Sequence, residues 1–161
     1  NQYCLRYAAL NGFEFNPPKT HPFNPLTALR MSLKEVSGDE QLRVIDAIFK
    51  GGWSHGADLG DSTSLISLLK KHSINGESLS QKVLESDIKD LLINETNRAI
   101  EKGIFGVPTI IVDDNLFWGN DQMDHIELLL NGKDPLDRQN LDNQERPRAI
   151  DRKAFKKLDK D

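Results

Sequence analysis

The sequence predicts an α/β fold that is mostly helical, with a short sheet near its C-terminal end. Through most of residues 2–103, apolar residues recur every three or four positions, which is the period of amphipathic helices. After Gly103, two short runs rich in β-branched and aromatic residues, TIIVD and LFWG, flank an Asp-Asn turn, and a helical period then returns. We therefore expect several helices, then a β-hairpin, and then a last helix.

Residues that cap or break helices set the expected boundaries. Asn24 can cap free backbone N–H groups, and Pro25 at the first helical position gives up an N–H that has no partner in any case. Asp61 or Ser62 can cap a later helix, and the glycine-rich GGWSHG segment is expected to close the helix before it. The expected helices cover approximately residues 2–11, 25–36, 39–52, 62–72, 78–84, 86–103 and 123–130.

The composition excludes several kinds of site. The chain has 161 residues and one cysteine, Cys4, so it contains no intrachain disulfide, no Cys-x-x-Cys pair and no cysteine-built metal site. We expect Cys4 to be buried as a small hydrophobic residue, and the four histidines show no metal-ligand spacing. The apolar runs are too short to span a membrane, which predicts a cytoplasmic protein with no membrane partner.

The charge pattern separates the C-terminal segment from the rest. The net charge of −4 argues against a nucleic-acid partner, because phosphate binding favours a basic face. Residues 133–161 carry nine basic and seven acidic residues and few apolar ones, so we expect a partly disordered tail. Ile150, Ala154 and Leu158, at four-residue steps, allow a short helix within it.

The expected sheet has too few strands. Residues 109–112, TIIV, are apolar on both faces, which is typical of a central strand that is covered on both sides. A two-stranded hairpin alone is only marginally stable in water. We therefore expect the strands that complete the sheet to lie upstream of Asn1 or to come from another chain, through a homodimer or a strand-completing partner.

The Val107–Pro108 bond directly precedes the first expected strand. Only about 5–6% of X-Pro bonds in folded proteins are cis. A proline after a long helix and before a hairpin and a helix is nevertheless the layout of the C-terminal half of a thioredoxin-type fold. We expect a cis bond that turns the backbone of Val107 outward, where a peptide-like ligand can pair with it as an added strand.

Five segments resemble one known family in their order and spacing. They are HPFNPLTALR (21–30), GGW (51–53), FGVPT (105–109), WGND (118–121) and RPRAIDRK (146–153). Together they resemble the DsbA-like thioredoxin-fold proteins, and within them the branch of 2-hydroxychromene-2-carboxylate isomerases and kappa-class glutathione transferases. The resemblance implies a helical insertion domain (1–103), the C-terminal half of a thioredoxin-like domain (104–132) and the tail (133–161). Family members begin with a βαβ segment that carries a Ser or Cys nucleophile, and these 161 residues do not include it.

The resemblance also implies glutathione as the cofactor. Val107 would pair its backbone with the cysteinyl part of glutathione, and Pro108 would hold that geometry. Asn120 and Asp121 would take the γ-glutamyl end, since a carboxylate at a helix start can receive the ligand's ammonium. Asp121 is equally well explained as a plain helix N-cap. We expect no catalytic residue and no metal site in this chain.

Three functions are compatible with this pattern. The first is a glutathione-dependent isomerase acting on aromatic ring-cleavage products, inactive as this chain because the nucleophile is missing. The second is a DsbA-like thiol-disulfide oxidoreductase, and a Cys-x-x-Cys at the nucleophile position would favour it, whereas a Ser would favour the isomerase. The third is a truncated, non-catalytic binding module. Trp53 and Trp118 are candidates to line a pocket for an aromatic 2-oxo acid substrate, although large aromatics at element ends are more often core.

Overall fold

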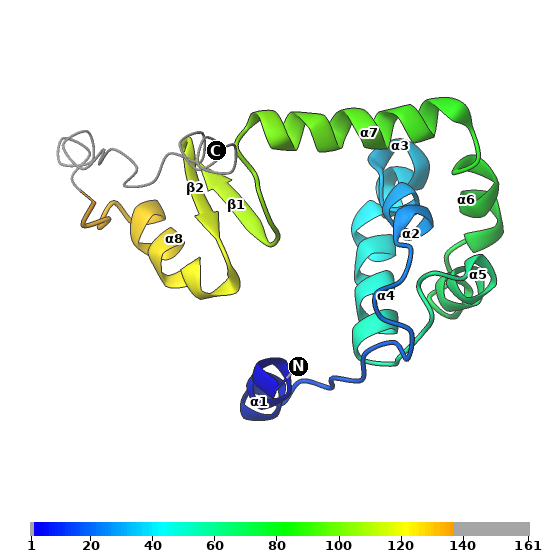
Figure 1. The fold of residues 1–161 in the computed structure, drawn as a ribbon, viewed down its shortest axis with the longest axis horizontal. Coiled ribbons are helices and arrows are strands. Elements are labelled where there is room, and N and C mark those ends of the chain that lie inside the picture. Colours follow the sequence, from blue (N-terminus) through cyan, green and yellow to red (C-terminus); the bar gives the residue numbers. More distant parts are fainter. Residues whose placement is uncertain (1, 137–161) are drawn as a thin grey trace, which may run out of the picture. The chain divides into compact units, whose positions relative to one another are not determined.

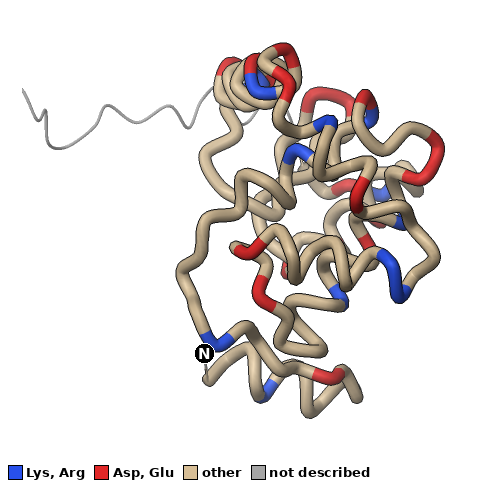
Figure 2. The backbone as a smooth tube through the Cα atoms, turned by 90° about the vertical axis from the view of Figure 1, so that its right-hand side faces the viewer, with Lys and Arg blue, Asp and Glu red and all other residues tan. Residues whose placement is uncertain are grey.

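The computed structural model describes residues 2–136 and divides the chain into two compact units. Unit 1, Asn1–Gly103, is helical, and unit 2, Ile104–Asp161, contains a β-hairpin and a helix within its described residues (Figure 1). The fold is therefore α/β and mostly helical. Acidic and basic residues are interspersed along the described backbone (Figure 2). No helix in residues 2–136 is long and apolar enough to cross a membrane.

Unit 1 consists of α-helices and a 3-10 helix, with the irregular segment 12–25 between the first two α-helices and shorter connections elsewhere. Its elements are α1 (Gln2–Asn11), α2 (Leu26–Met31), α3 (Lys34–Ser37), the 3-10 helix η1 (Gly38–Glu40), α4 (Gln41–Trp53), α5 (Ser62–Lys71), α6 (Gly76–Lys82) and α7 (Ser86–Glu101). The side chain of Asp61 caps α5, as expected, by accepting a hydrogen bond from the Ser64 N–H at 2.7 Å.

The core of unit 1 forms where α2, α4 and α5 bury their apolar faces. Its most deeply buried side chains are Met31, Val44, Leu65 and Leu69. Helix α4 ends within the GGWSHG segment, as the sequence predicts. Gly51 also has a packing role, because a Cβ atom there would overlap the side chain of Leu68 on α5. The absence of a side chain therefore lets α5 approach α4 closely.

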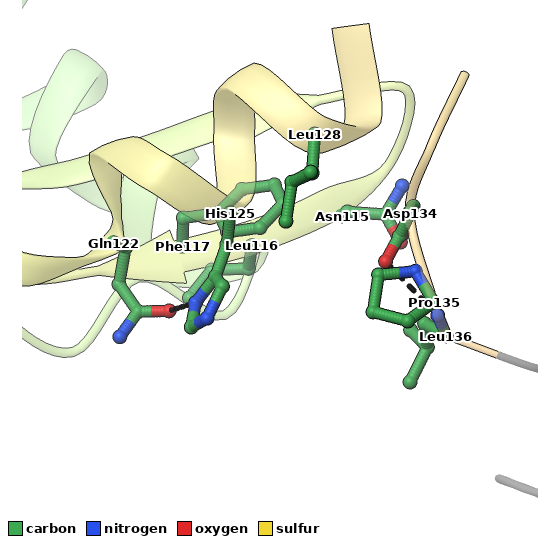
Figure 3. A pocket seen from close by; sticks show the side chains of 9 residues that line it. All are labelled: Asn115, Leu116, Phe117, Gln122, His125, Leu128, Asp134, Pro135 and Leu136. Carbon is green, nitrogen blue, oxygen red and sulfur yellow. Dashed lines mark hydrogen bonds between the residues drawn. The ribbon is translucent and has the colours of Figure 1, made fainter. Parts of the chain in front are cut away.

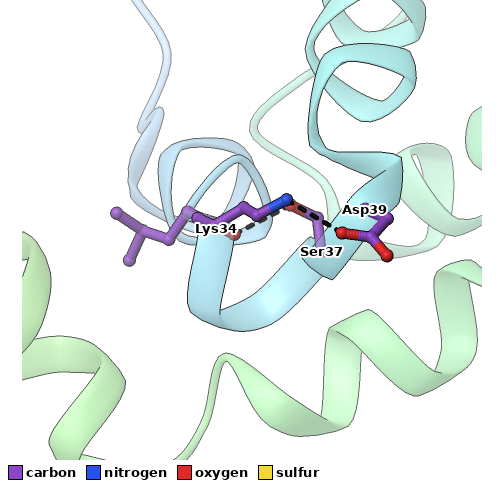
Figure 4. A network of polar contacts seen from close by, with 4 residues as sticks. Lys34, Ser37 and Asp39 are labelled. Carbon is purple, nitrogen blue, oxygen red and sulfur yellow. Dashed lines mark hydrogen bonds and ion pairs between the residues drawn. The ribbon is translucent and has the colours of Figure 1, made fainter.

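The single helix expected over residues 25–36 is wrong, because α2 and α3 are separate helices. Leu33, which precedes α3, has extended backbone angles (φ −69°, ψ 142°) that interrupt the helix. The Ser37 hydroxyl donates to the Leu33 carbonyl at 2.8 Å, and Lys34 pairs with Asp39 at 3.1 Å (Figure 4). These local side-chain bonds hold α3 as a short turn that leads into η1.

Two predictions at the start of the chain also need correction. Pro25 is the N-cap residue of α2 and not its first helical residue, so the helix begins one position later than expected. Asn24 still satisfies a backbone donor, because its Oδ1 accepts from the Leu26 N–H at 3.1 Å. Cys4 is exposed and not buried, because Ala8 is the residue that α1 buries.

Unit 2 begins with an antiparallel hairpin of β1 (Thr109–Val112) and β2 (Asn115–Trp118). The turn consists of Asp113 and Asp114, whose φ angles of 46° and 63° are the positive values that tight two-residue hairpin turns require. The turn therefore lies one residue earlier than the expected Asp-Asn pair, because Asn115 already belongs to β2.

The hairpin is followed by the 3-10 helix η2 (Asn120–Gln122) and by α8 (Met123–Leu130). Ile126 of α8 is buried, whereas Ile111, Leu116 and Trp118, which share one face of the hairpin, are exposed. Most of the predicted tail, including the RPRAIDRK motif and the short helix near Ala154, lies outside the described residues.

Candidate functional site

One end of the hairpin brings together the two predicted binding segments. The register pairs Thr109 with Trp118, and one step further the Gly119 N–H donates to the Pro108 carbonyl at 3.0 Å. The ladder thus continues past the ends of both strands. As a result Val107–Pro108, before β1, and Asn120–Asp121, after β2, lie at the same end of the sheet.

Val107 presents an unused backbone donor and acceptor. Its peptide bond to Pro108 is cis, as is His21–Pro22 in unit 1. The Val107 side chain is 87% exposed, and neither its N–H nor its C=O makes a hydrogen bond within residues 2–136. An extended ligand can use such a backbone pair as a neighbouring strand would.

An aromatic pair lies beside this backbone. The rings of Phe105 and Trp118 have centroids 5.2 Å apart at an angle of 48°, and the Trp118 side chain is 53% exposed. A Cβ atom on Gly106 would lie 2.7 Å from Trp118 Nε1, so only glycine lets the indole lie over the loop. The Thr109 hydroxyl donates to the Gly106 carbonyl at 2.5 Å, which fixes the loop and leaves Thr109 a structural role.

Asp121 supplies a carboxylate next to the same loop. A Cβ atom on Gly119 would overlap Asp121 Oδ1, and the φ of 110° at this position also favours glycine. Asp121 is exposed and has no hydrogen-bond or ion-pair partner among the described residues. The N-cap of α8 is Gln122, so Asp121 is not a plain N-cap of that helix. Its carboxylate is available to a ligand's ammonium group.

Unit 2 also contains a pocket of about 440 Å³ (Figure 3). It is lined by Asn115, Leu116, Phe117, Gln122, His125, Leu128, Asp134, Pro135 and Leu136. His125 Nδ1 lies 3.0 Å from Gln122 Oε1 there. Sequence reasoning did not select these residues, and none of the four predicted glutathione contacts lines this pocket.

The two tryptophans belong to different units, and each is described within its own unit. Trp53 is half-buried in unit 1, where its ring is parallel to that of Phe15 at 6.4 Å and lies 5.6 Å from that of His21. It also borders a pocket of about 140 Å³ next to Phe23 and Leu29. Trp118 belongs to the hairpin of unit 2.

A family model for the DsbA-like thioredoxin domain matches residues 4–131. The chain belongs to the DsbA-like thioredoxin domain family. Since the match runs through both units, the helical unit and the hairpin unit are parts of one family domain. Val107 and Pro108 thus immediately precede the first strand of the thioredoxin-like half.

The curated proteins that this chain resembles share one name. The chain is similar to the 2-hydroxychromene-2-carboxylate isomerase of Sphingobium xenophagum, with 27% identity over 92 residues, which cover 57% of this chain and 47% of that protein. It is also similar to the isomerase of the same name from Pseudomonas putida, with 31% identity over 84 residues, 52% of this chain and 41% of the relative. The matched part spans less than half the length of either relative.

A solved structure has the same fold. It is described as selenomethionine 2-hydroxychromene-2-carboxylate isomerase, and it aligns with a TM-score of 0.70 over 88% of this chain and 67% of its own. The sequence identity is 23%, so this likeness concerns the fold.

Proposed function

We propose that the end of the hairpin in unit 2 binds glutathione, in a glutathione-dependent isomerase that acts on aromatic ring-cleavage products. The observation that carries the proposal is the unused backbone pair of Val107 beside the unpartnered carboxylate of Asp121. The backbone would pair with the cysteinyl residue of glutathione, and Asp121 would receive the γ-glutamyl ammonium. The names of the relatives support the isomerase class, and an aromatic 2-oxo acid is the substrate that we propose.

The residues present indicate which chemical groups glutathione would supply and which the chain would supply. When bound, glutathione would supply a thiol that adds reversibly to a conjugated carbonyl compound, which loosens a double bond so that it can rotate. Thr109 is the one hydroxyl-bearing residue among residues 104–136, which contain no cysteine, and it donates to the Gly106 carbonyl. We therefore propose that this chain binds and orients glutathione without activating its thiol.

The test is calorimetric titration of the 161-residue chain with glutathione. We expect weak binding, and we expect Asp121→Ala to weaken it by about 1–3 kcal/mol, because the ammonium of the ligand loses its charged partner. Asp124→Ala is the matched control, since Asp124 is an exposed acid in the first turn of α8 and should leave the affinity unchanged.

Two outcomes would contradict the proposal. Equal weakening by both substitutions would mean that Asp121 acts only through general charge. Turnover of an aromatic 2-oxo acid by the unmodified chain with glutathione, followed by absorbance, would mean that an activating residue exists within these residues.

A thiol-disulfide oxidoreductase is the alternative, because the open backbone of Val107 would receive an extended peptide as well as glutathione. A non-catalytic module that binds peptides would use the Val107 backbone in the same way. Comparing the affinities for a peptide and for glutathione separates these two peptide-binding functions from the isomerase. If an extended cysteine-containing peptide binds far more tightly than glutathione and ignores Asp121→Ala, peptide recognition is favoured over the isomerase.

A further inference from the structure

Besides the pocket next to Trp53, unit 1 contains another pocket, between α2 and α7, and none of the proposed glutathione contacts lines it. Its volume is about 320 Å³, which lies in the range of small-molecule sites in proteins. It is lined by Leu26, Leu29, Arg30, Lys89, Leu92, Ile93, Thr96 and Asn97. Four of these eight residues are aliphatic and four are polar, the walls are mainly apolar, and two of the polar residues are cationic.

Arg30 is the unusual member of this lining. Its Nε atom is buried and has no hydrogen-bond partner within the described residues. The rest of its guanidinium makes no hydrogen bond or ion pair there either. By contrast, Arg98 on α7 pairs with Glu95 at 2.7 Å. Nε is too buried for a molecule in the pocket to reach, but the two terminal NH2 groups of the guanidinium are not buried in this way and also lack a partner, so they are the donors that a ligand can use.

The remaining polar groups reinforce the positive character of the pocket. Lys89 makes no ion pair within residues 2–136, and no Asp or Glu is among the lining residues. The Thr96 hydroxyl donates to the Leu92 carbonyl of its own helix at 2.8 Å. The pocket thus offers charged donors and one side-chain amide, with no carboxylate to neutralise the two cations.

We propose that the pocket between α2 and α7 binds an amphipathic carboxylate, an acid with one carboxylate group and an apolar or aromatic body. The Arg30 guanidinium would hold the carboxylate through its two terminal NH2 groups, and Lys89 would add a second positive charge. Leu26, Leu29, Leu92 and Ile93 would cover the apolar body. The site does not depend on the proposed glutathione site, because all of its lining residues lie in unit 1.

The experiment measures binding of 2-naphthoate to the 161-residue chain by calorimetry at low salt, without glutathione. The neutral 2-acetylnaphthalene tests the need for charge, and acetate tests the need for an apolar body. We expect measurable binding of 2-naphthoate, and affinity at least about tenfold lower for each of the two comparison compounds. Binding of 2-naphthoate should weaken as salt rises, since the pocket is partly open to solvent.

Three substitutions assign the effect to the pocket. Arg30→Gln should lower the affinity for 2-naphthoate at least about tenfold, and Lys89→Gln should lower it less, because Lys89 is more exposed. Arg98→Gln, which removes a cation on the same helix outside the pocket, should change nothing. Circular dichroism checks that each variant is folded, and Lys89→Gln, on the surface, keeps the test valid if Arg30→Gln unfolds.

The proposal is overturned if 2-naphthoate does not bind, or if 2-acetylnaphthalene binds as tightly as 2-naphthoate. It is also overturned if neither Arg30→Gln nor Lys89→Gln changes the affinity, or if Arg98→Gln lowers it equally. A failure of glutathione binding has no bearing on these outcomes, so the two proposals fail separately.

Discussion

At the scale of single residues, Arg30 in unit 1 and Asp121 in unit 2 are both charged side chains without a partner. Each carries a charge with no partner among the described residues, Arg30 beside the α2–α7 pocket and Asp121 beside the Val107 loop. A charged group without a partner contributes little to folding and can cost free energy where it is partly buried. The cost applies to Arg30, whose Nε is buried, whereas the exposed carboxylate of Asp121 is solvated by water.

This argument predicts how Arg30 affects the stability of the unliganded chain. Arg30→Met removes the unsatisfied buried donor and keeps most of the side-chain volume, so the free energy of unfolding should stay the same or rise by up to about 1 kcal/mol. Urea denaturation followed by circular dichroism measures this change.

Arg43→Met is the comparison variant. Arg43 pairs with Glu40 and donates to the His72 carbonyl at 2.8 Å, so its loss should destabilise the chain by about 0.5–1.5 kcal/mol. If Arg30→Met destabilises the chain as much as Arg43→Met does, Arg30 is a structural residue.

For single residues, the sequence predicts a role correctly where the interaction joins residues that are close in the chain. The side chains of Asn24 and Asp61 accept from backbone N–H groups, as the sequence predicts, because those groups lie only two or three residues further along the chain. Arg30 received no role, although it ends the quoted HPFNPLTALR motif, because its meaning depends on α7, more than fifty residues further along the chain. Cys4 was misplaced for a similar reason, since its burial depends on what packs against α1.

At the scale of secondary-structure elements, α5 offers a direct test of the predicted capping. Asp61 accepts from the Ser64 N–H at 2.7 Å, and α5 contributes the fully buried Leu65 and Leu69 to the core of unit 1. Asp61→Ala should therefore lower the free energy of unfolding by about 0.5–2 kcal/mol, measured by urea denaturation.

Asp61→Asn is the control, because it keeps an oxygen that can accept the same hydrogen bond without the charge. It should recover most of the lost stability. If Asp61→Asn is as destabilising as Asp61→Ala, the charge near the helix start matters more than the hydrogen bond.

The elements that the sequence predicts well have repeated apolar positions and clear ends. Helices α4, α5 and α7 and the hairpin fall in this group. The break between α2 and α3 was missed, because apolar periodicity continues through Leu33 while the backbone there turns to an extended conformation. Periodicity reports which side chains face the core, and it does not detect a short interruption of the helix between them.

At the scale of the whole molecule, the predicted boundary after residue 103 coincides with the division between the two units. The family resemblance implied this boundary, and the helical spacing also gives way to β-branched runs after Gly103. The shortage of strands was also visible in the sequence, since TIIV reads as a central strand. What completes the sheet could not be derived, because strand pairing joins residues far apart in sequence or in different chains.

The hairpin leaves one edge of β1 unpaired within the described residues. The Gly119 N–H bonds to the Pro108 carbonyl, and antiparallel pairs alternate between bonded and non-bonded positions. The N–H groups of Thr109 and Ile111 therefore point away from β2. An exposed row of this kind, on a strand with Ile111 40% exposed, is a template for another strand.

We predict that the 161-residue chain self-associates through this edge of β1. Ile111→Pro removes one outward N–H without touching a hydrogen bond to β2, so it should weaken association at least about tenfold. Ile111→Val keeps that N–H and should associate as the unmodified chain does. Sedimentation velocity over a range of concentrations measures the association, and amide exchange checks that β1 and β2 remain paired. A chain that stays monomeric at all concentrations, with the Thr109 and Ile111 amides protected from exchange, would show that residues of the same chain cover the edge.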